Sequence, residues 1–134
     1  MENKKSTILF IYPPSPVMNR EDRCQQETQD LLVIPPLPPT DLMYLASIAE
    51  ECGFNAIIRD YSLGGDLVDD LRKYSPEYLV ANIATPTFKS DIMAVSKAKE
   101  VLPNITTIVK GAPFLTYNTN VIYENPFVDI VIMG

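Results

Sequence analysis

The residues best suited to chemistry stand at the ends of short apolar runs. An acid, Asp60, follows one run, a hydroxyl, Thr85, follows the next, and a lysine, Lys110, follows a third. An acid, a hydroxyl and a lysine at neighbouring strand ends are the residue types of a site that accepts a phosphoryl group on aspartate. Such a site also needs an acidic pair to hold Mg²⁺, and Tyr12 and Pro13 stand where that pair would be. The three residues also come one strand too early, so this chemistry is disfavoured.

Several other chemistries are excluded by what the sequence lacks. It contains no histidine, which removes Ser-His-Asp and Cys-His catalysis, histidine-based zinc sites and an imidazole ligand to a cofactor metal. Cys24 and Cys52 follow no metal or redox spacing, and we expect Cys52 to be a small buried residue at a helix end. Neither GxGxxG nor GxxxxGK[ST] occurs, so the common nucleotide-phosphate loops are absent. We predict no catalytic residue and no metal ligand.

The turns after the apolar runs are small, hydroxyl-bearing or apolar rather than charged. The stretch ATPTF at 84–88 supplies two hydroxyls beside the start of a helix, and KGAPF at 110–114 supplies a glycine that lets a bulky group approach the backbone. The proline-rich segments PPSP at 13–16 and IPPLPP at 34–39 can wall a large, flat ligand. This composition suits a large, weakly charged molecule held by many contacts better than a small anion.

The same residues have structural explanations that the sequence leaves open. Thr85 and Thr87 can satisfy backbone groups around a strand-to-helix turn. Gly111 can simply serve a turn. Asp60 can end a strand or cap a helix, and Lys110 can be solvated or paired with an acid.

The elements that must position these turns follow from the apolar pattern. Continuous apolar runs of this length are typical of strands buried on both faces of a parallel sheet. Helical periodicity lies between them, with Thr40 as the cap and Asp41 in the first turn of the first helix, Gly53 at its end, and Ser90 as the cap of the third. Strands are predicted at Thr7–Tyr12, Asn55–Arg59, Tyr78–Ile83, Ile105–Val109 and Val128–Met133, and helices over about 40–52, 67–74, 90–102 and 116–124.

This alternation predicts an α/β fold. Repeated right-handed crossovers give a doubly wound, five-stranded parallel sheet with helices on both faces, and we expect the flavodoxin-like strand order 2-1-3-4-5. Ligands of such sheets bind at the carboxyl ends of the strands. Residues 13–39 form a long loop insertion between the first strand and the first helix, polar at its centre, which we predict to be mobile without a ligand.

Length and charge narrow the class of protein. The 134 residues suit one domain, and a net charge of −6 with scattered basic residues disfavours a nucleic-acid partner. The apolar run near the N-terminus is too short for a signal peptide, and no run is long enough to span a membrane. We therefore expect a cytoplasmic domain. Because the chain stops at Gly134, directly after the fifth strand and without a covering helix, we also expect a fragment of a longer protein.

Taken in order, the motifs resemble a known family. The segments ILFIYPP, PPLPPTDLMYLASIAEECGFNAIIRDYS, YLVANIATPTF, ITTIVKGAPFLT and VDIVIMG resemble the N-terminal cobalamin (B12)-binding domain of B12-dependent radical SAM enzymes, a group that includes Mg-protoporphyrin IX monomethyl ester cyclase-like proteins. The resemblance covers nearly the whole chain. Each motif alone is weak, while their order and spacing are more specific.

The resemblance implies a domain that binds cobalamin and positions it beside a C-terminal radical SAM domain of the same chain. That missing part would hold S-adenosyl-L-methionine and a 4Fe–4S cluster, for a cyclase-like or methyl-transfer reaction. The proline turn and the segment 35–39 would border the corrin, and the third and fourth turns would lie near its rim and nucleotide tail. The cofactor-binding residues so implied are Pro13, Pro14, Thr85, Pro86, Thr87, Gly111, Ala112 and Pro113.

The sequence departs from this family at two points. Lys110-Gly111-Ala112-Pro113-Phe114 stands where relatives often have Gly-Gly-Pro-His, and the Asp-x-His-x-x-Gly signature of cobalamin mutases is missing. A lysine here would crowd the tail or pair with its phosphate. The alternative from another class is a flavodoxin-like receiver or interaction module that binds no corrinoid.

Overall fold

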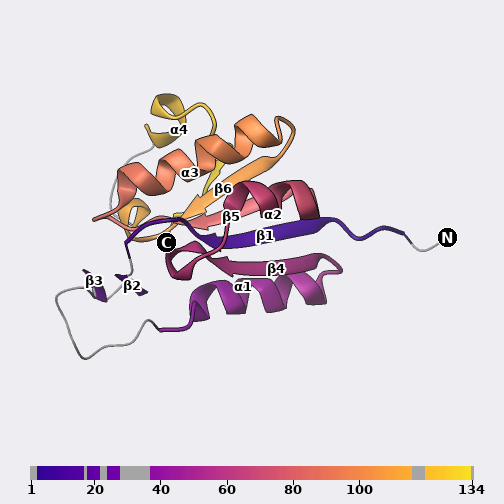
Figure 1. Ribbon diagram of the computed structural model, residues 1–134, viewed down its shortest axis with the longest axis horizontal. Helices are drawn as coiled ribbons and strands as arrows, with labels where there is room; N and C mark the ends of the chain where they lie inside the picture. Colours follow the sequence, from indigo (N-terminus) through magenta and orange to yellow (C-terminus); the bar gives the residue numbers. More distant parts are fainter. Residues whose placement is uncertain (1–2, 17, 22–23, 28–36, 116–119, 134) are drawn as a thin grey trace.

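The fold is seen in a computed structural model of the chain, which describes residues 3–16, 18–21, 24–27, 37–115 and 120–133. Its centre is a sheet of five parallel strands in the order β4-β1-β5-β6-β7 (Figure 1). In chain order this is 2-1-3-4-5, so the predicted flavodoxin-like topology is confirmed. The strands are β1 (Thr7–Tyr12), β4 (Asn55–Asp60), β5 (Tyr78–Asn82), β6 (Thr106–Lys110) and β7 (Ile130–Val131).

Four of the five strands lie within a residue of their predicted bounds, because each is an apolar run with no competing pattern. β7 is much shorter than the predicted Val128–Met133. It is an edge strand that pairs with β6 through Ile108–Ile130 and Val109–Val131. Only these two residues of the predicted segment take part in the ladder.

Helices cover both faces of the sheet, as predicted (Figure 1). One face packs on α1, and the other packs on α2 and α3. The helices are α1 (Thr40–Glu51), α2 (Leu67–Tyr74), α3 (Phe88–Val101) and α4 (Val121–Glu124), with short 3₁₀ turns η1 (Tyr61–Leu63) and η2 (Ala112–Phe114). Of the segment predicted as a weak fourth helix, 116–119 lies outside the described residues.

Two predicted helix caps are wrong. Thr40 is already helical, and the capping position is Pro39, whose side chain makes no capping bond. Ser90 lies inside the first turn of α3, where its hydroxyl donates to the carbonyl of Thr87 at 2.9 Å. Gly53 does end α1, with a φ of 91° that favours glycine.

Cys52 is exposed, which corrects the expectation that it is buried. It follows Glu51, the last residue of α1, and occupies the C-cap position. The buried residues of this helix are Leu42, Ala46 and Ala49. The apolar stripe therefore ends one turn earlier than its periodicity indicates, because the chain leaves the helix at Cys52.

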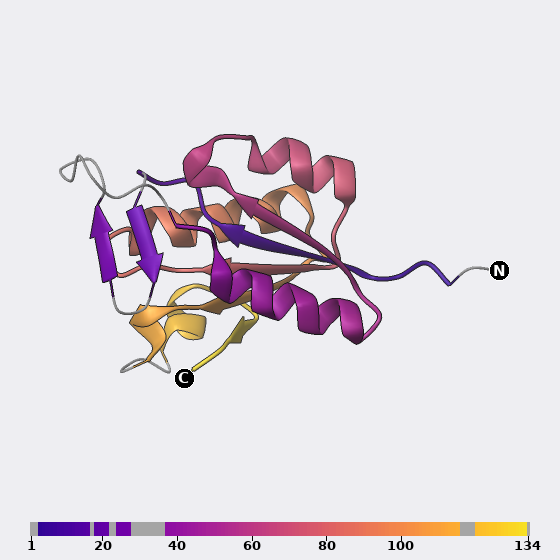
Figure 2. The same cartoon turned by 90° about the horizontal axis from the view of Figure 1, so that it is seen from below.

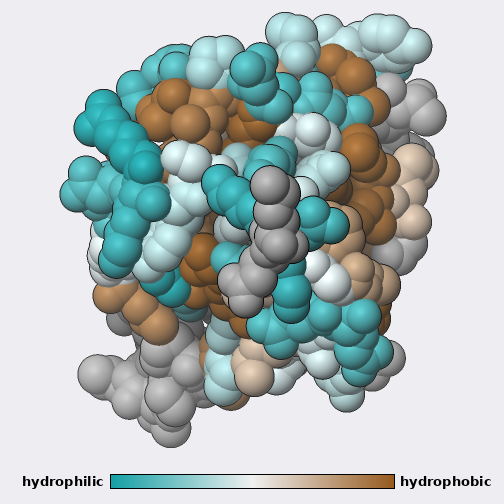
Figure 3. Space-filling view, turned by 90° about the vertical axis from the view of Figure 1, so that its right-hand side faces the viewer, coloured by the Kyte–Doolittle hydropathy of each residue, from teal (hydrophilic) through white to brown (hydrophobic). Residues whose placement is uncertain are grey.

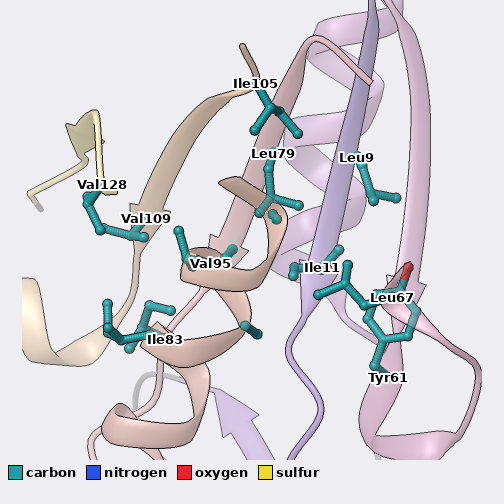
Figure 4. Packing of buried hydrophobic residues seen from close by; sticks show 14 of the residues in the cluster. Leu9, Ile11, Tyr61, Leu67, Leu79, Ile83, Val95, Ile105, Val109 and Val128 are labelled. Carbon is teal, nitrogen blue, oxygen red and sulfur yellow. The ribbon is translucent and has the colours of Figure 1, made fainter. Parts of the chain in front are cut away.

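The core consists of two clusters, one on each face. The larger joins β1, β5 and β6 to α2 and α3, with Leu9, Leu79 and Val109 facing Val95 and Leu67 (Figure 4). The smaller cluster packs on α1. Its buried members are Phe10, Tyr12, Leu42, Ala46, Ala49 and Val80. Alternate residues of β1 thus point into different clusters, as expected for a central strand covered on both sides.

The 13–39 insertion contains an element that the sequence did not predict. Two short strands, β2 (Met18–Glu21) and β3 (Cys24–Glu27), pair antiparallel. This hairpin lies beyond the carboxyl ends of the sheet (Figure 2). Residues 28–36, which include part of the second proline cluster, lie outside the described residues. The mobility of the insertion stays a prediction.

The opposite end of the molecule is built from loops at the amino ends of the strands. Figure 3 looks onto this end and shows hydrophobic groups separated by hydrophilic ones. A hollow of about 270 Å³ lies between the turns 75–77 and 102–105, before β5 and β6. Among the described residues, no helix combines the length and apolar character needed to cross a bilayer.

Asp66 offers a direct test of a local signal that the sequence reading missed. Its carboxylate caps α2 by accepting from the backbone N–H groups of Val68 at 2.8 Å and Asp69 at 3.0 Å. Asp66→Ala should lower the free energy of unfolding by about 1 kcal/mol, measured by urea titration. Asp69→Ala, which removes a first-turn acid but no cap, should lower it by only about 0.3 kcal/mol. Equal effects of the two changes would contradict the capping role.

Candidate functional site

The turns after the strands form one edge of the sheet, which we call the carboxyl rim. It comprises residues 13–16 after β1, 61–63 after β4, 83–87 after β5 and 111–114 after β6. All the predicted cofactor-binding residues lie on it. Pro14, Thr85 and Pro86 are exposed, Thr87, Ala112 and Pro113 are half-buried, and Pro13 and Gly111 are buried.

The rim has a polar centre at the point where the chain order reverses, between β1 and β5. The carboxylate of Asp41, in the first turn of α1, accepts three hydrogen bonds there. They come from the hydroxyl of Tyr12 at 2.7 Å, the amide of Asn82 at 2.5 Å and the ammonium of Lys110 at 2.7 Å. We call these four residues the switch-point cluster. In doubly wound folds this position is where ligands bind.

The contacts within the cluster favour the ionised form of Asp41. Partial burial on its own raises the pKa of Asp41. The hydrogen bonds from Lys110, Tyr12 and Asn82, together with the positive charge of Lys110, outweigh burial and hold the pKa of Asp41 below its ordinary value. The side chain of Lys110 is only 15% exposed, so this ion pair is screened less than a surface pair. The sequence left open whether Lys110 is solvated or paired with an acid. In the structure it is paired with Asp41.

The ATPTF turn is fixed by a residue that the sequence reading missed. Asp91, fully buried in α3, accepts from the backbone N–H of Ala84 at 3.0 Å and from the hydroxyl of Thr87 at 2.8 Å. Its own N–H donates to the carbonyl of Thr87 at 2.9 Å. The hydroxyl of Thr87 therefore serves the turn. Thr85 and Pro86 are exposed at its tip.

Gly111 is required by the fold itself. Its φ of 132° is a conformation that side chains disfavour. A Cβ at this position would also lie far inside the contact distance of the Ile83 carbonyl oxygen. The two backbones are this close because the Ile83 N–H donates to the carbonyl of Lys110 at 2.7 Å, one residue beyond the end of β5. The absence of a side chain at Gly111 thus allows the backbones that follow β5 and β6 to approach each other closely.

One hollow on the rim is large enough to receive part of a ligand. It has a volume of about 410 Å³. Pro16 from the turn after β1 faces the ATPTF turn and the start of α3 across it. Its lining is apolar with two hydroxyls and one cation, from Pro16, Pro86, Thr87, Lys89, Ser90 and Met93. The hollow brings together two of the predicted regions, whereas Pro13, Pro14 and residues 111–113 do not line it.

Asp60, Thr85 and Lys110 do not form a phosphoacceptor site. The Asp60 carboxylate caps η1, accepting from the Ser62 N–H at 3.0 Å, and Lys110 pairs with Asp41. Asp60 ends β4, an edge strand separated from β6 by β1 and β5. Within the described ranges, no group of three histidine, cysteine or acidic residues could hold a metal ion.

Two polar residues beside the rim could have been suspected from weak signals. Asn82 is a polar residue near the end of the apolar run YLVANI, where a buried side chain must find a hydrogen-bond partner. Asp91 follows Thr87 by four positions, which places it one helical turn further on. Neither spacing identifies its partners, because those lie on other elements.

Comparison with known proteins supports the fold alone. No family model matches the chain, and no curated protein matches it. Among solved structures, a novel cobalamin-binding protein from Desulfitobacterium hafniense DCB-2 is similar, with a TM-score of 0.59 and 16% identity over 96% of this chain. The alignment covers 53% of that protein, so this chain spans about half its length.

A second similar structure comes from signalling. It is a chain from the complex of the histidine kinase ThkA with the response regulator protein TrrA. The TM-score is 0.56 with 11% identity, over 96% of this chain and 85% of that one. At such identities both likenesses establish the shared flavodoxin-like architecture alone.

The close approach at Gly111 predicts an unusually intolerant glycine. Gly111→Ala should lower the free energy of unfolding by at least about 2 kcal/mol, because it adds a backbone clash to an unfavourable φ. Gly53→Ala is the matched control. Its φ is 91° but nothing lies within 4 Å of the added Cβ, so it should cost about 1 kcal/mol. Urea unfolding of both variants tests this, and an equal loss would show that the clash is relieved at no cost.

The lowered pKa of Asp41 predicts a pH dependence of stability. Because the pKa is lower in the folded than in the unfolded chain, the ionised carboxylate stabilises the fold above its ordinary pKa of 3.8. That contribution is lost as the pH falls through the folded pKa. Asp41→Asn should therefore lower stability at neutral pH and flatten the loss of stability in acid, measured as thermal midpoint against pH.

Asp69→Asn is the control for this pH profile, because it makes the same chemical change on an exposed residue of α2. It should change the profile much less than Asp41→Asn does, because Asp69 lies outside the switch-point cluster. If the Asp41→Asn profile were parallel to that of the wild-type chain, the cluster would not couple the titration of Asp41 to folding.

Proposed function

We propose that this chain is a corrinoid-binding domain, which holds cobalamin against the carboxyl rim within a larger B12-dependent radical SAM enzyme. The observation that carries the proposal is the hollow between Pro16 and the ATPTF turn. It lies on the edge where doubly wound sheets bind ligands. It also brings Pro16, at the end of the proline turn, opposite the ATPTF turn, which the sequence resemblance assigns to the rim and tail of the corrin.

The chemistry of the hollow fits a large, weakly charged ligand. Pro16, Pro86 and Met93 offer apolar contacts, while Thr87, Ser90 and Lys89 offer polar groups at its border. A ligand of corrinoid size exceeds the hollow and would extend over the exposed tip of the turn at Thr85 and over the proline segment. Many shallow contacts of this kind suit such a molecule better than a small anion, which needs a few converging donors.

The fit is less direct at the fourth turn. Gly111 is explained by the approach of Ile83, so it gives no separate evidence for a ligand. Ala112 and Pro113 are half-buried in η2 and leave part of their surface for contact. Since the chain has no histidine, the domain would hold the corrinoid through its edges and side groups and would not supply an imidazole to the cobalt.

In the larger enzyme, bound cobalamin would supply methyl transfer or radical chemistry beside S-adenosyl-L-methionine and a 4Fe–4S cluster. The residues of this chain would bind and orient the corrinoid and shield one side of it from water. We assign them binding roles only, and no role as acid, base or nucleophile. The domain on its own would bind without turnover, in the cytoplasm, as one unit spanning residues 1–134.

The second candidate is a receiver-like or interaction module. The similarity to a chain of the kinase–response regulator complex favours it. The contacts of Asp60 and Lys110 do not favour it as a phosphoacceptor, because Asp60 caps η1 and Lys110 is paired with Asp41.

Titration with hydroxocobalamin tests the proposal. The purified chain should co-elute with the visible absorption of the corrin in gel filtration and give a saturable spectral titration. Met93→Glu places a charge in the apolar lining at a side chain that is 60% exposed, so it should fold normally. It should raise the dissociation constant at least about tenfold, because burying the new carboxylate under the ligand is costly.

Met43→Glu is the matched control, since Met43 is 50% exposed on α1 and lines a different hollow. It should bind like the wild-type chain. Clean separation of folded protein from the corrin would refute corrinoid binding by this chain. Loss of binding in Met43→Glu but not in Met93→Glu would move the ligand to α1 and contradict the site.

A further inference from the structure

In the switch-point cluster, the hydrogen-bond donors and the acceptor come from different parts of the fold. Three donors from the ends of three adjacent strands, β1, β5 and β6, converge on one acceptor. The acceptor, Asp41, comes from α1, which follows the long insertion. In these three bonds the strands supply the donors, from Tyr12, Asn82 and Lys110, and the negative charge is brought to them by another element.

A set of this composition is what an anion requires. It offers a hydroxyl, an amide NH₂ and an ammonium, and one full positive charge on Lys110. In the free domain the carboxylate of Asp41 uses one oxygen for Tyr12 and the other for both Asn82 and Lys110. The tetrahedral oxygens of a phosphate can accept from the same three donors, because they point in several directions.

The exposure of the pair indicates the side from which an anion would enter. The side chain of Asp41 is 33% exposed, while that of Lys110 is 15% exposed. The Asp41 side chain is therefore more accessible to solvent than that of Lys110. An anion that takes all three donors has to replace the carboxylate that they now hold.

We propose that Tyr12, Asn82 and Lys110 form a phosphate-binding site that Asp41 occupies in the free domain, and that the phosphodiester of a bound ligand takes this site by displacing the Asp41 carboxylate. For the identity of the ligand this rests on the proposed corrinoid function. The exchange replaces one anion by another beside Lys110, so no charge is left buried and unpaired. It also releases the start of α1 from the sheet, which couples ligand binding to the position of that helix.

Comparing two corrinoids tests the proposal on the wild-type chain. Cobalamin carries the nucleotide phosphodiester, and cobinamide lacks it. The chain should bind cobalamin at least about tenfold more tightly than cobinamide, as one charge-assisted hydrogen bond would give. Lys110→Met should remove this preference and leave the affinity for cobinamide unchanged. Asp41→Asn, a weaker competitor for the donors, should tighten cobalamin alone.

Lys97→Met is the control, because Lys97 forms an exposed pair with Glu100 on α3 at 2.7 Å, and it should leave both affinities unchanged. Retention of the preference for cobalamin in Lys110→Met would overturn the phosphate site while leaving corrinoid binding intact. If neither corrinoid binds the wild-type chain, the proposed function itself fails and the corrinoid as source of the phosphate fails with it.

A second measurement tests the donor set without any corrinoid. In Asp41→Ala the site is vacated, and inorganic phosphate should raise the thermal midpoint more than sodium chloride does at the same ionic strength. The double variant Asp41→Ala/Lys110→Met should lose this difference. If Asp41→Ala does not fold, Asp41→Asn with and without Lys110→Met serves for the same comparison. Equal effects of phosphate and chloride in the vacated site would overturn the proposal.

Discussion

The hydrogen bonds to the Asp41 carboxylate hold together the part of the molecule on which its function would depend. Parallel strands end at one edge with their last side chains close together, and a polar side chain buried there must be paired. Tyr12, Asn82 and Lys110 meet this condition through one acceptor from α1. The position of α1, and with it the end of the long insertion, is thereby tied to three strands at once.

This arrangement divides the carboxyl rim into two parts of different character. On the side of α1 the rim is polar and closed by the switch-point cluster. On the side of α3 it is open and mostly apolar, in the hollow between Pro16 and the ATPTF turn. A ligand with a large apolar body and one anionic group could use both parts at once. That combination distinguishes a corrinoid with its nucleotide tail from a small phosphate ester, which would need only the first part.

The fold could be predicted from the sequence because its signals are local. The apolar runs fix the strands, and the alternation with helical periodicity fixes the topology. Local patterns failed at the two ends of α1, where residue type and periodicity do not fix the exact boundary of the helix. Thr40 has the right residue type for a cap, yet Pro39 takes the capping position. Cys52 continues the periodicity of α1, yet the helix has already ended.

The candidate site was only partly predictable for the same reason. The position of the rim and the residues after each strand follow from topology. The contacts of Asp41 do not, since they span 29, 41 and 69 positions in the chain. No spacing rule connects residues so far apart. From the sequence, Asp41 was only a favourable charge for a helix dipole, and Lys110 was either solvated or paired.

The buried Asp91 has a consequence for binding at the open part of the rim. Because its carboxylate already holds the backbone of Ala84 and the hydroxyl of Thr87, the ATPTF turn is preorganised. A ligand that rests on its exposed tip would not have to freeze this segment, so little conformational entropy would be lost on that wall of the hollow. The affinity of the site would then depend mainly on how much ordering the opposite, proline-bearing wall requires.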